Sequence, residues 1–189
     1  MKIHSILACS SVNGPGRRFV VWVQGCNRRC GGCFNQGAQS FAGGVEMSRG
    51  EILEEIDTHE VTGLTVSGGE PFEQEEDLAE LLVSVKKMGL TTLVYTGYTW
   101  EELWDRKSTA LKYCDWLIDG QYKKNIPTHC RWTGSGNQRV LLLQNGHITG
   151  DATEWEPYSE TGEIIINENG TVTTTGFINM GKEGNYYGK

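Results

Sequence analysis

The chain has 189 residues and a net charge of −7, and this length suffices for one domain with a sizeable core. No apolar run is long enough to span a bilayer, and the acidic balance argues against nucleic acid as the main partner. We therefore expect a folded protein whose partners include neither a membrane nor nucleic acid.

The six cysteines fall into two groups. Three stand in a C-x3-C-x2-C spacing within Gly25–Asn35, whereas Cys9, Cys114 and Cys130 are scattered singly. In a secreted protein six cysteines would suit three disulfides, but this distribution suits a reducing cytoplasm. The N-terminal stretch Met1–Ala8 is typical of a first strand rather than of a signal peptide. Both observations predict a cytoplasmic protein.

Five runs rich in apolar, β-branched or aromatic residues predict strands. The second run contains several Val and a Trp, and it follows the turn residues Asn13–Gly16. The predicted strands are Ile3–Ala8, Arg18–Gln24, Val61–Val66, Thr91–Tyr95 and Trp116–Ile118.

Three helices are expected between these strands. Ser48–Glu51 and Thr99–Glu102 have the S/T-x-x-E form of a capping box, which predicts helices that run to about His59 and Tyr113. The remaining helix runs from about Gln74 to Met88, with acids in its first turn and lysines in its last, as the helix dipole favours.

This alternation of strands and helices with short connections predicts an α/β fold with a parallel sheet. In such sheets ligands bind at the carboxyl ends of the strands. The unusual motifs all stand at such ends, namely the cysteine loop, Ser67–Glu70, Thr96–Tyr98 and Asp119–Gly120. Too few βα units are present to close eight strands, so we expect a partial (β/α) barrel.

The pattern changes in the last quarter of the chain. After the apolar run Val140–Leu143, the stretches Glu163–Ile166 and Thr171–Thr175 flank the turn residues Asn167–Gly170, which predicts a β-hairpin. The polar tail, residues 181–189, is expected to be loose.

Two domains follow from this change, a first one of residues 1–140 and a β-rich C-terminal extension of residues 141–189 packed on it. A hairpin alone is only marginally stable, so it must pack on something. Two interpretations stay open: the extension caps the open edge of the barrel, or it recognises a macromolecular substrate.

The clustered cysteines, Cys26, Cys30 and Cys33, predict a metal centre. Their spacing is too tight for unstrained mutual disulfides but allows three thiolates to converge on a soft metal. A structural zinc needs four ligands, and the next candidates are as far away as His59 and Cys114. A single [4Fe–4S] cluster bound by three cysteines would leave one iron open for a ligand, and we favour it over zinc.

These motifs together resemble the radical S-adenosylmethionine (SAM) superfamily, and more closely its branch of glycyl-radical-enzyme activases, of the kind that activates anaerobic ribonucleotide reductase. The resemblance runs from about Ile3 to Val140. It is carried by the cysteine loop and by the stretches Asn13–Arg17, Cys33–Asn35, Ser67–Pro71, Thr96–Tyr98, Leu117–Gly120 and Arg131–Gln138.

The resemblance implies an open, partial (β/α) barrel that holds one [4Fe–4S] cluster on Cys26, Cys30 and Cys33. It implies reductive cleavage of SAM to a 5'-deoxyadenosyl radical, which takes hydrogen from a glycine Cα of a partner such as anaerobic ribonucleotide reductase. Arg17, Arg18, Arg28 and Arg29 bracket the cluster loop. They are either solvated or internally paired, or some of them form a rim that docks an acidic electron donor such as flavodoxin.

The resemblance also implies a SAM site at the strand ends. The segment Ser67–Glu70 would hold the methionine amino group, with Glu70 as its carboxylate partner. Phe34 would touch the adenine or merely pack, and Asp119, a costly buried charge if unpaired, would face SAM, a monovalent cation or a basic side chain. The implied cofactor-binding residues are Phe34, Asn35, Ser67, Gly68, Gly69, Glu70, Thr96, Tyr98 and Asp119, with Asn137 and Gln138 as residues that close the site.

Three alternatives remain open. Thr96 and Tyr98 equally suit a plain strand-end turn with a packed tyrosine. The chain also suits a radical SAM enzyme of the same branch that acts on a peptide, a small molecule or another partner. A non-enzymatic metal-binding scaffold is the third alternative.

Overall fold

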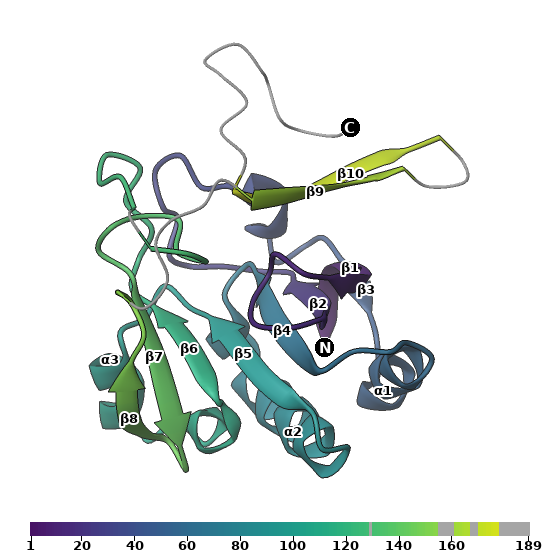
Figure 1. Ribbon diagram of the computed structural model, residues 1–189, viewed down its shortest axis with the longest axis horizontal. Helices are drawn as coiled ribbons and strands as arrows, with labels where there is room; N and C mark the ends of the chain where they lie inside the picture. The colour runs from purple at the N-terminus through teal and green to yellow at the C-terminus, as the bar shows by residue number, and fades with distance from the viewer. Residues whose placement is uncertain (129, 155–160, 167–169, 178–189) are drawn as a thin grey trace.

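The computed structural model describes residues 1–128, 130–154, 161–166 and 170–177. Its centre is an eight-stranded sheet in the order β3-β1-β2-β4-β5-β6-β7-β8 (Figure 1). All five predicted strands are present, whereas β3 and β8 have no counterpart among the predicted elements. The bounds are β1 Lys2–Ser10, β2 Arg18–Val23, β3 Val45–Glu46, β4 Gly63–Gly68, β5 Thr91–Tyr95, β6 Trp116–Asp119, β7 Arg139–Gln144 and β8 His147–Asp151.

The sheet is mixed, with a parallel centre. Strands β2, β4, β5 and β6 run parallel, as their alternation with helices predicts. Strands β1 and β3 at one side, and β7 and β8 at the other, are joined by antiparallel pairing. The carboxyl ends of the four central strands therefore meet at one edge of the sheet, and the α/β class is confirmed.

The helices pack on one face of this sheet. Helix α1 (Arg49–Asp57) begins at a complete capping box on Ser48, and α3 (Trp100–Asp105) begins at another on Thr99, as predicted. Leu81 and Leu82 of α2 (Glu75–Lys87) are buried against the strands. Three short 3₁₀ helices, η1 Gln36–Ala38, η2 Pro71–Gln74 and η3 Ala110–Tyr113, complete the chain's described helical segments.

The prediction that the third helix reaches Tyr113 is wrong, because α3 ends at Asp105. Lys107 adopts a left-handed conformation with φ of 58°. Its N–H donates to the Trp104 carbonyl at 2.9 Å, and the N–H of Ser108 donates to the Leu103 carbonyl at 3.0 Å. This is a Schellman termination in which lysine occupies the position usually held by glycine, so no glycine announces it.

The opposite face of the sheet carries a smaller core and one buried cation. Leu93 and Ile118 pack there against Trp132 from the loop after β6. Arg18 is fully buried on β2; its Nε donates to Thr65 Oγ1 at 3.1 Å, and Thr65 Oγ1 in turn donates to the Asn13 carbonyl at 2.8 Å. Burial lowers the pKa of Arg18 to about 10. Arg18 thus fixes the β1–β2 loop and has no part in a solvent-facing rim.

The last described strands form a separate ribbon. Strands β9 (Thr161–Ile166) and β10 (Val172–Phe177) pair antiparallel, while residues 167–169 of the predicted turn and the tail 181–189 lie outside the described residues. Figure 1 shows this ribbon lying across one end of the sheet, remote from α1 and α2. The predicted domain boundary after Val140 falls inside β7, which pairs with β6 and β8 in the main sheet.

No helix in the described ranges has both the length and the apolar character needed to cross a membrane.

Candidate cluster and cofactor site

A cavity of about 380 Å³ lies at the carboxyl ends of the parallel strands. It brings together the cysteine loop and the strand-end motifs, which are separated by up to about a hundred residues of sequence. Of the predicted residues, those that line it are Cys26, Cys30, Cys33, Phe34, Asn35, Ser67, Gly68, Gly69, Glu70, Thr96 and Gln138. Tyr98, Asp119 and Asn137 are not among its lining residues.

Backbone hydrogen bonds fix the conformation of the cysteine loop. The N–H of Gly25 donates to the Ala38 carbonyl at 2.7 Å, which ties the start of the loop to η1. Within the loop, the N–H of Arg28 donates to Cys26 Sγ and the N–H of Asn35 donates to Cys33 Sγ, both at 3.3 Å. Backbone donors of this kind stabilise thiolate ligands.

The donor set fits an iron–sulfur cluster better than a single ion. Cys26, Cys30 and Cys33 all line the cavity, and Cys26 and Cys33 already accept backbone N–H donors. Among the described residues, no three His, Cys, Asp or Glu side chains converge closely enough to hold one metal ion. A zinc ion would need thiolates about 2.3 Å from one common point, whereas a four-iron cluster takes thiolates at separate corners.

The Gly68–Gly69 pair at the end of β4 lies against the cysteine loop. The N–H of Gly69 donates to the Val23 carbonyl at 2.7 Å, and the N–H of Glu70 donates to the Gly25 carbonyl at 2.8 Å. A Cβ on Gly69 would lie 2.2 Å from the Gly25 carbonyl oxygen. Glycine is therefore required at position 69 by the close approach of two backbones, which places the strand end beside the cluster loop.

Glu70 connects the end of β4 with the end of β5 at the wall of the cavity. Its side chain is 1% exposed; Oε1 accepts from Thr96 Oγ1 at 2.8 Å and from the N–H of Phe72 at 3.2 Å, and Oε2 accepts from the N–H of Gly97 at 2.7 Å. Burial raises the pKa of Glu70 to about 7, although these hydrogen bonds oppose the shift. The carboxylate accepts three hydrogen bonds, so one of its about four acceptor positions is left for a further donor.

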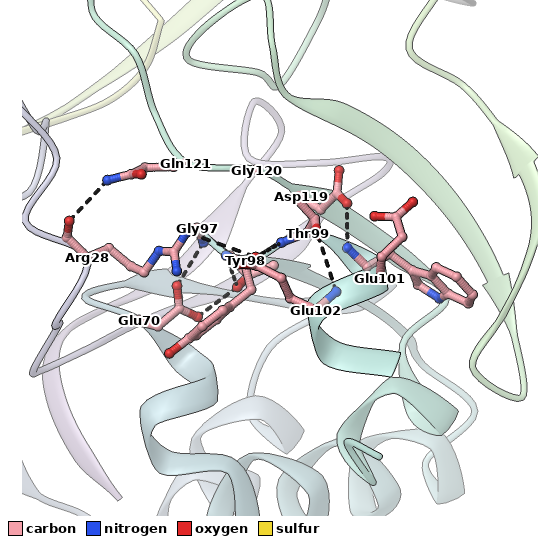
Figure 2. Close-up of polar contacts among 12 residues, drawn as sticks. Arg28, Glu70, Gly97, Tyr98, Thr99, Glu101, Glu102, Asp119, Gly120 and Gln121 are labelled. Atoms are coloured by element: carbon pink, nitrogen blue, oxygen red, sulfur yellow. Dashed lines mark hydrogen bonds and ion pairs between the residues drawn. The ribbon is translucent and has the colours of Figure 1, made fainter. Parts of the chain in front are cut away.

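Arg28 and Tyr98 lie next to this carboxylate, as Figure 2 shows. The Arg28 guanidinium stacks on the Tyr98 ring, 4.5 Å from its centroid. Tyr98 Oη donates to Glu73 Oε1 at 3.0 Å, so its hydroxyl is directed to a helix start and not into the cavity. This arrangement corresponds to the alternative in which Tyr98 is a packed side chain of a strand-end turn. Arg28 lines the cavity, and its Nε is buried without a hydrogen-bond partner in the described part of the chain.

Asp119 is paired with a basic side chain. It is 1% exposed; Oδ1 accepts from Arg139 Nε at 2.9 Å, and Oδ2 accepts from the N–H of Trp100 at 2.7 Å and from Arg139 Nη2. Arg139 also binds Glu101 at 2.8 and 3.0 Å, and these hydrogen bonds lower the pKa of Glu101 to about 2. Three partners were expected for Asp119, and the one that it contacts is the basic side chain, Arg139.

The outer wall of the cavity is aromatic. The ring of Phe34 is 55% exposed and lies against Tyr122, with ring centroids 4.7 Å apart. Gln138 lines the cavity, and its Nε2 donates to the Gly120 carbonyl at 3.0 Å. Asn137 supports the same wall from outside, since its Nδ2 donates to the Gln121 carbonyl at 2.8 Å.

Several lining residues were not predicted from the sequence. Three of them are aromatic residues on or beside strand ends, namely Trp22, Tyr95 and Tyr122. The alternation of side chains along β2 and β5 could have indicated Trp22 and Tyr95, but no sequence pattern indicates Tyr122. His4 also lines the cavity, although it reads as an ordinary residue in the sequence. The four residues Thr173–Gly176 of β10 line it as well, and nothing in the sequence indicates that the ribbon reaches the site.

Comparison with known proteins gives a consistent result. Residues 12–141 match the family described as "4Fe-4S single cluster domain". The chain is 35% identical over 153 residues to the anaerobic ribonucleoside-triphosphate reductase-activating protein of Enterobacteria phage T4, a match that covers 77% of this chain and 97% of that protein.

Two further relatives come from bacteria. The anaerobic ribonucleoside-triphosphate reductase-activating protein of Vibrio cholerae is 34% identical, with 74% of this chain and 97% of that protein covered. The pyruvate formate-lyase-activating enzyme of Clostridium pasteurianum is 35% identical, with 65% of this chain and 56% of that enzyme covered.

Proposed function

The chain belongs to the glycyl-radical-enzyme activases of the radical SAM type, and on this premise we propose that it activates an anaerobic ribonucleoside-triphosphate reductase. It is an enzyme that uses a [4Fe–4S] cluster and SAM to install a glycyl radical. When bound, the cluster supplies the electron that cleaves SAM reductively to methionine and a 5'-deoxyadenosyl radical, which takes a hydrogen atom from the glycine Cα of the partner.

The choice of partner rests on how much of each relative is matched. The alignment spans 97% of two proteins named as activators of anaerobic ribonucleoside-triphosphate reductase. It spans only 56% of the pyruvate formate-lyase-activating enzyme, although the identity is similar at 35%. A partner of the pyruvate formate-lyase kind is therefore the second candidate.

The roles of the cavity residues follow from their chemistry. Cys26, Cys30 and Cys33 would hold the cluster, and the backbone and carboxylate of Ser67–Glu70 would bind the methionine ammonium. Arg28 suits the methionine carboxylate, since this residue lines the cavity and its buried Nε has no hydrogen-bond partner among the described residues. Phe34, with Asn35, Thr96 and Tyr122, would form the adenosine side of the site.

Two broader features belong to the same proposal. The curved, open sheet with its parallel centre would be the partial (β/α) barrel of radical SAM enzymes, carrying β9–β10 as a C-terminal β-hairpin extension. The free thiols of Cys9, Cys26, Cys30, Cys33 and Cys114 suit a reducing compartment, the cytoplasm.

Electron paramagnetic resonance tests the proposed function directly. We expect the reconstituted protein, incubated anaerobically with SAM, dithionite and the anaerobic ribonucleoside-triphosphate reductase from the same source, to produce a glycyl radical signal. Omission of SAM should remove the signal. A protein that cleaves SAM but gives no signal with this reductase, and does give one with a pyruvate formate-lyase, would replace the first candidate by the second.

Electron delivery supplies a separate prediction. Arg29 is an exposed cation of the cluster loop, whereas Arg18 is buried and Arg28 is stacked on Tyr98. We propose that Arg29 helps to dock an acidic reductant such as flavodoxin.

Reduction of the cluster by flavodoxin should then slow with rising salt, and Arg29→Glu should lower its rate about tenfold or more at low salt. Stopped-flow reduction measures both effects, with dithionite as the control because this small reductant has no protein surface to dock. Equal flavodoxin rates in the two proteins would reject the proposal.

A further inference from the structure

The ribbon β9–β10 is attached to the rest of the protein beside the cavity. The N–H of Ser11 donates to Glu163 Oε1 at 2.7 Å, and Asn13 Nδ2 donates to Thr175 Oγ1 at 2.9 Å. Glu163 and Thr175 are direct cross-strand partners, so both side chains lie on the same face of the ribbon. That face is therefore turned toward the β1–β2 loop. The other face carries Ile164, which is 57% exposed.

Strand β10, rather than β9, borders the cavity. Four consecutive residues, Thr173–Gly176, line it, and no described residue of β9 does. Side chains alternate between the two faces of a strand, so a strand lying flat on the cavity would contribute every second residue only. A consecutive run of four from β10, with no described residue of β9, is the pattern expected when the long edge of β10, opposite β9, faces the cavity.

This edge presents backbone groups available for pairing. Strand β10 has one neighbour, β9, in a sheet of two strands. Within the described ranges, no hydrogen bond joins the backbone of Thr173–Gly176 to an element other than β9. An unpaired strand edge is a template onto which an extended chain adds by main-chain hydrogen bonds.

We propose that the free edge of β10 binds an extended polypeptide segment of the partner enzyme, namely the segment that carries the target glycine. The inference rests on the proposed function, because it specifies how the macromolecular substrate enters the same site. Pairing along β10 would place the segment beside the cavity that Cys26, Cys30 and Cys33 also line.

The chemistry of the edge suits a polypeptide in particular. Thr173, Thr174, Thr175 and Gly176 bear no charge, so a backbone with small side chains is accepted without desolvating an ion. Four residues of strand span about 13 Å, enough to align a short segment in one register. The family match ends at residue 141, so this edge lies outside the matched domain.

Hydrogen–deuterium exchange of the full-length, cluster-loaded protein tests the pairing itself. We expect amides within Thr173–Gly176 to exchange at least tenfold more slowly when the anaerobic ribonucleoside-triphosphate reductase is present. Antiparallel ladders use alternate N–H groups, so only the amides that do not pair with β9 should gain this protection. Exchange rates in this stretch that stay unchanged while the reductase is bound would overturn the proposal.

A matched pair of variants tests the consequence. Thr174→Lys places a long cation on the strand that borders the cavity, whereas Ile164→Lys places the same cation on the directly paired residue of β9, which does not line the cavity. We expect Thr174→Lys to lower the glycyl radical formed per SAM cleaved at least tenfold, and Ile164→Lys to leave it unchanged. Equal yields from the two variants would overturn the proposal.

The two hypotheses fail in different ways. If the wild type cleaves SAM but installs no radical on the reductase, the proposed partner is wrong and the inference falls with it. If the wild type does install the radical, while Thr174→Lys matches it and the amides of Thr173–Gly176 remain unprotected, only the role of the β10 edge is refuted.

Discussion

Replacement of any one of Cys26, Cys30 and Cys33 by Ala is expected to abolish SAM cleavage and to remove the cluster. The three cysteines line the cavity, and two of them already accept backbone hydrogen bonds. Loss of a mere outer-shell partner of a metal site costs about 10–100-fold in affinity or activity, so loss of a ligand should cost more than about 100-fold. Iron and sulfide analysis, together with single-turnover formation of 5'-deoxyadenosine, measures both effects.

Cys9 provides the matched control for this experiment. Its thiol lies outside the cavity and interacts with Arg17 Nε at 3.4 Å. Cys9→Ala should therefore retain the full iron content and SAM cleavage of the wild type. Zinc without iron in protein purified anaerobically would contradict the cluster assignment, as would normal SAM cleavage by a variant that lacks Cys30.

Glu70→Gln is expected to weaken SAM binding by about 1–3 kcal/mol, the contribution of a hydrogen bond to a charged group. This corresponds to roughly 5–150-fold in Kd. The physical reason is that an amide replaces the carboxylate that would face the methionine ammonium. The cluster content should stay unchanged, because Glu70 touches Thr96, Gly97 and Phe72 and none of the three cysteines. Equilibrium binding of SAM to the cluster-loaded protein measures the effect.

The pH dependence gives the same prediction a second readout. Burial raises the pKa of Glu70 to about 7, so the carboxyl is largely protonated at pH 6 and largely ionised at pH 8. An ammonium ligand favours the ionised form, so SAM affinity of the wild type should fall by about tenfold as the pH drops from 8 to 6. The Gln variant should show no such change.

Glu73→Gln is the control for Glu70→Gln. Glu73 is a neighbouring carboxylate that accepts from Tyr98 Oη and from Asn27 Nδ2, both at 3.0 Å, and it does not line the cavity. Its variant should bind SAM as the wild type does and keep the wild-type pH profile. If Glu70→Gln behaves in the same way, Glu70 serves only to join the two strand ends.

Short-range chemistry determined what could be predicted from the sequence. The spacing of Cys26, Cys30 and Cys33 is a property of one loop, and the capping boxes at Ser48 and Thr99 form within four residues. Strand–helix alternation is likewise local, and it sufficed to predict that the motifs meet at the carboxyl ends of parallel strands. The iron–sulfur class of the site followed from these features.

Long-range packing decided the remainder. Asp119 meets Arg139, twenty positions further on, only because β6 and β7 pair antiparallel, and no local pattern specifies that register. The hydroxyl of Tyr98 turns to Glu73 on a different element. Lys107 ends α3 in a conformation that glycine usually adopts.

The C-terminal ribbon is the clearest case of this division. Its two runs of β-branched residues, on either side of the turn residues Asn167–Gly170, predict two paired strands, because pairing needs only neighbours in sequence. Its position over the cluster cavity depends on hydrogen bonds between residues about 150 positions apart, Ser11 with Glu163 and Asn13 with Thr175. Contacts across such a separation form only when the whole sheet is assembled, so only the tertiary structure decided that β10 lines the site.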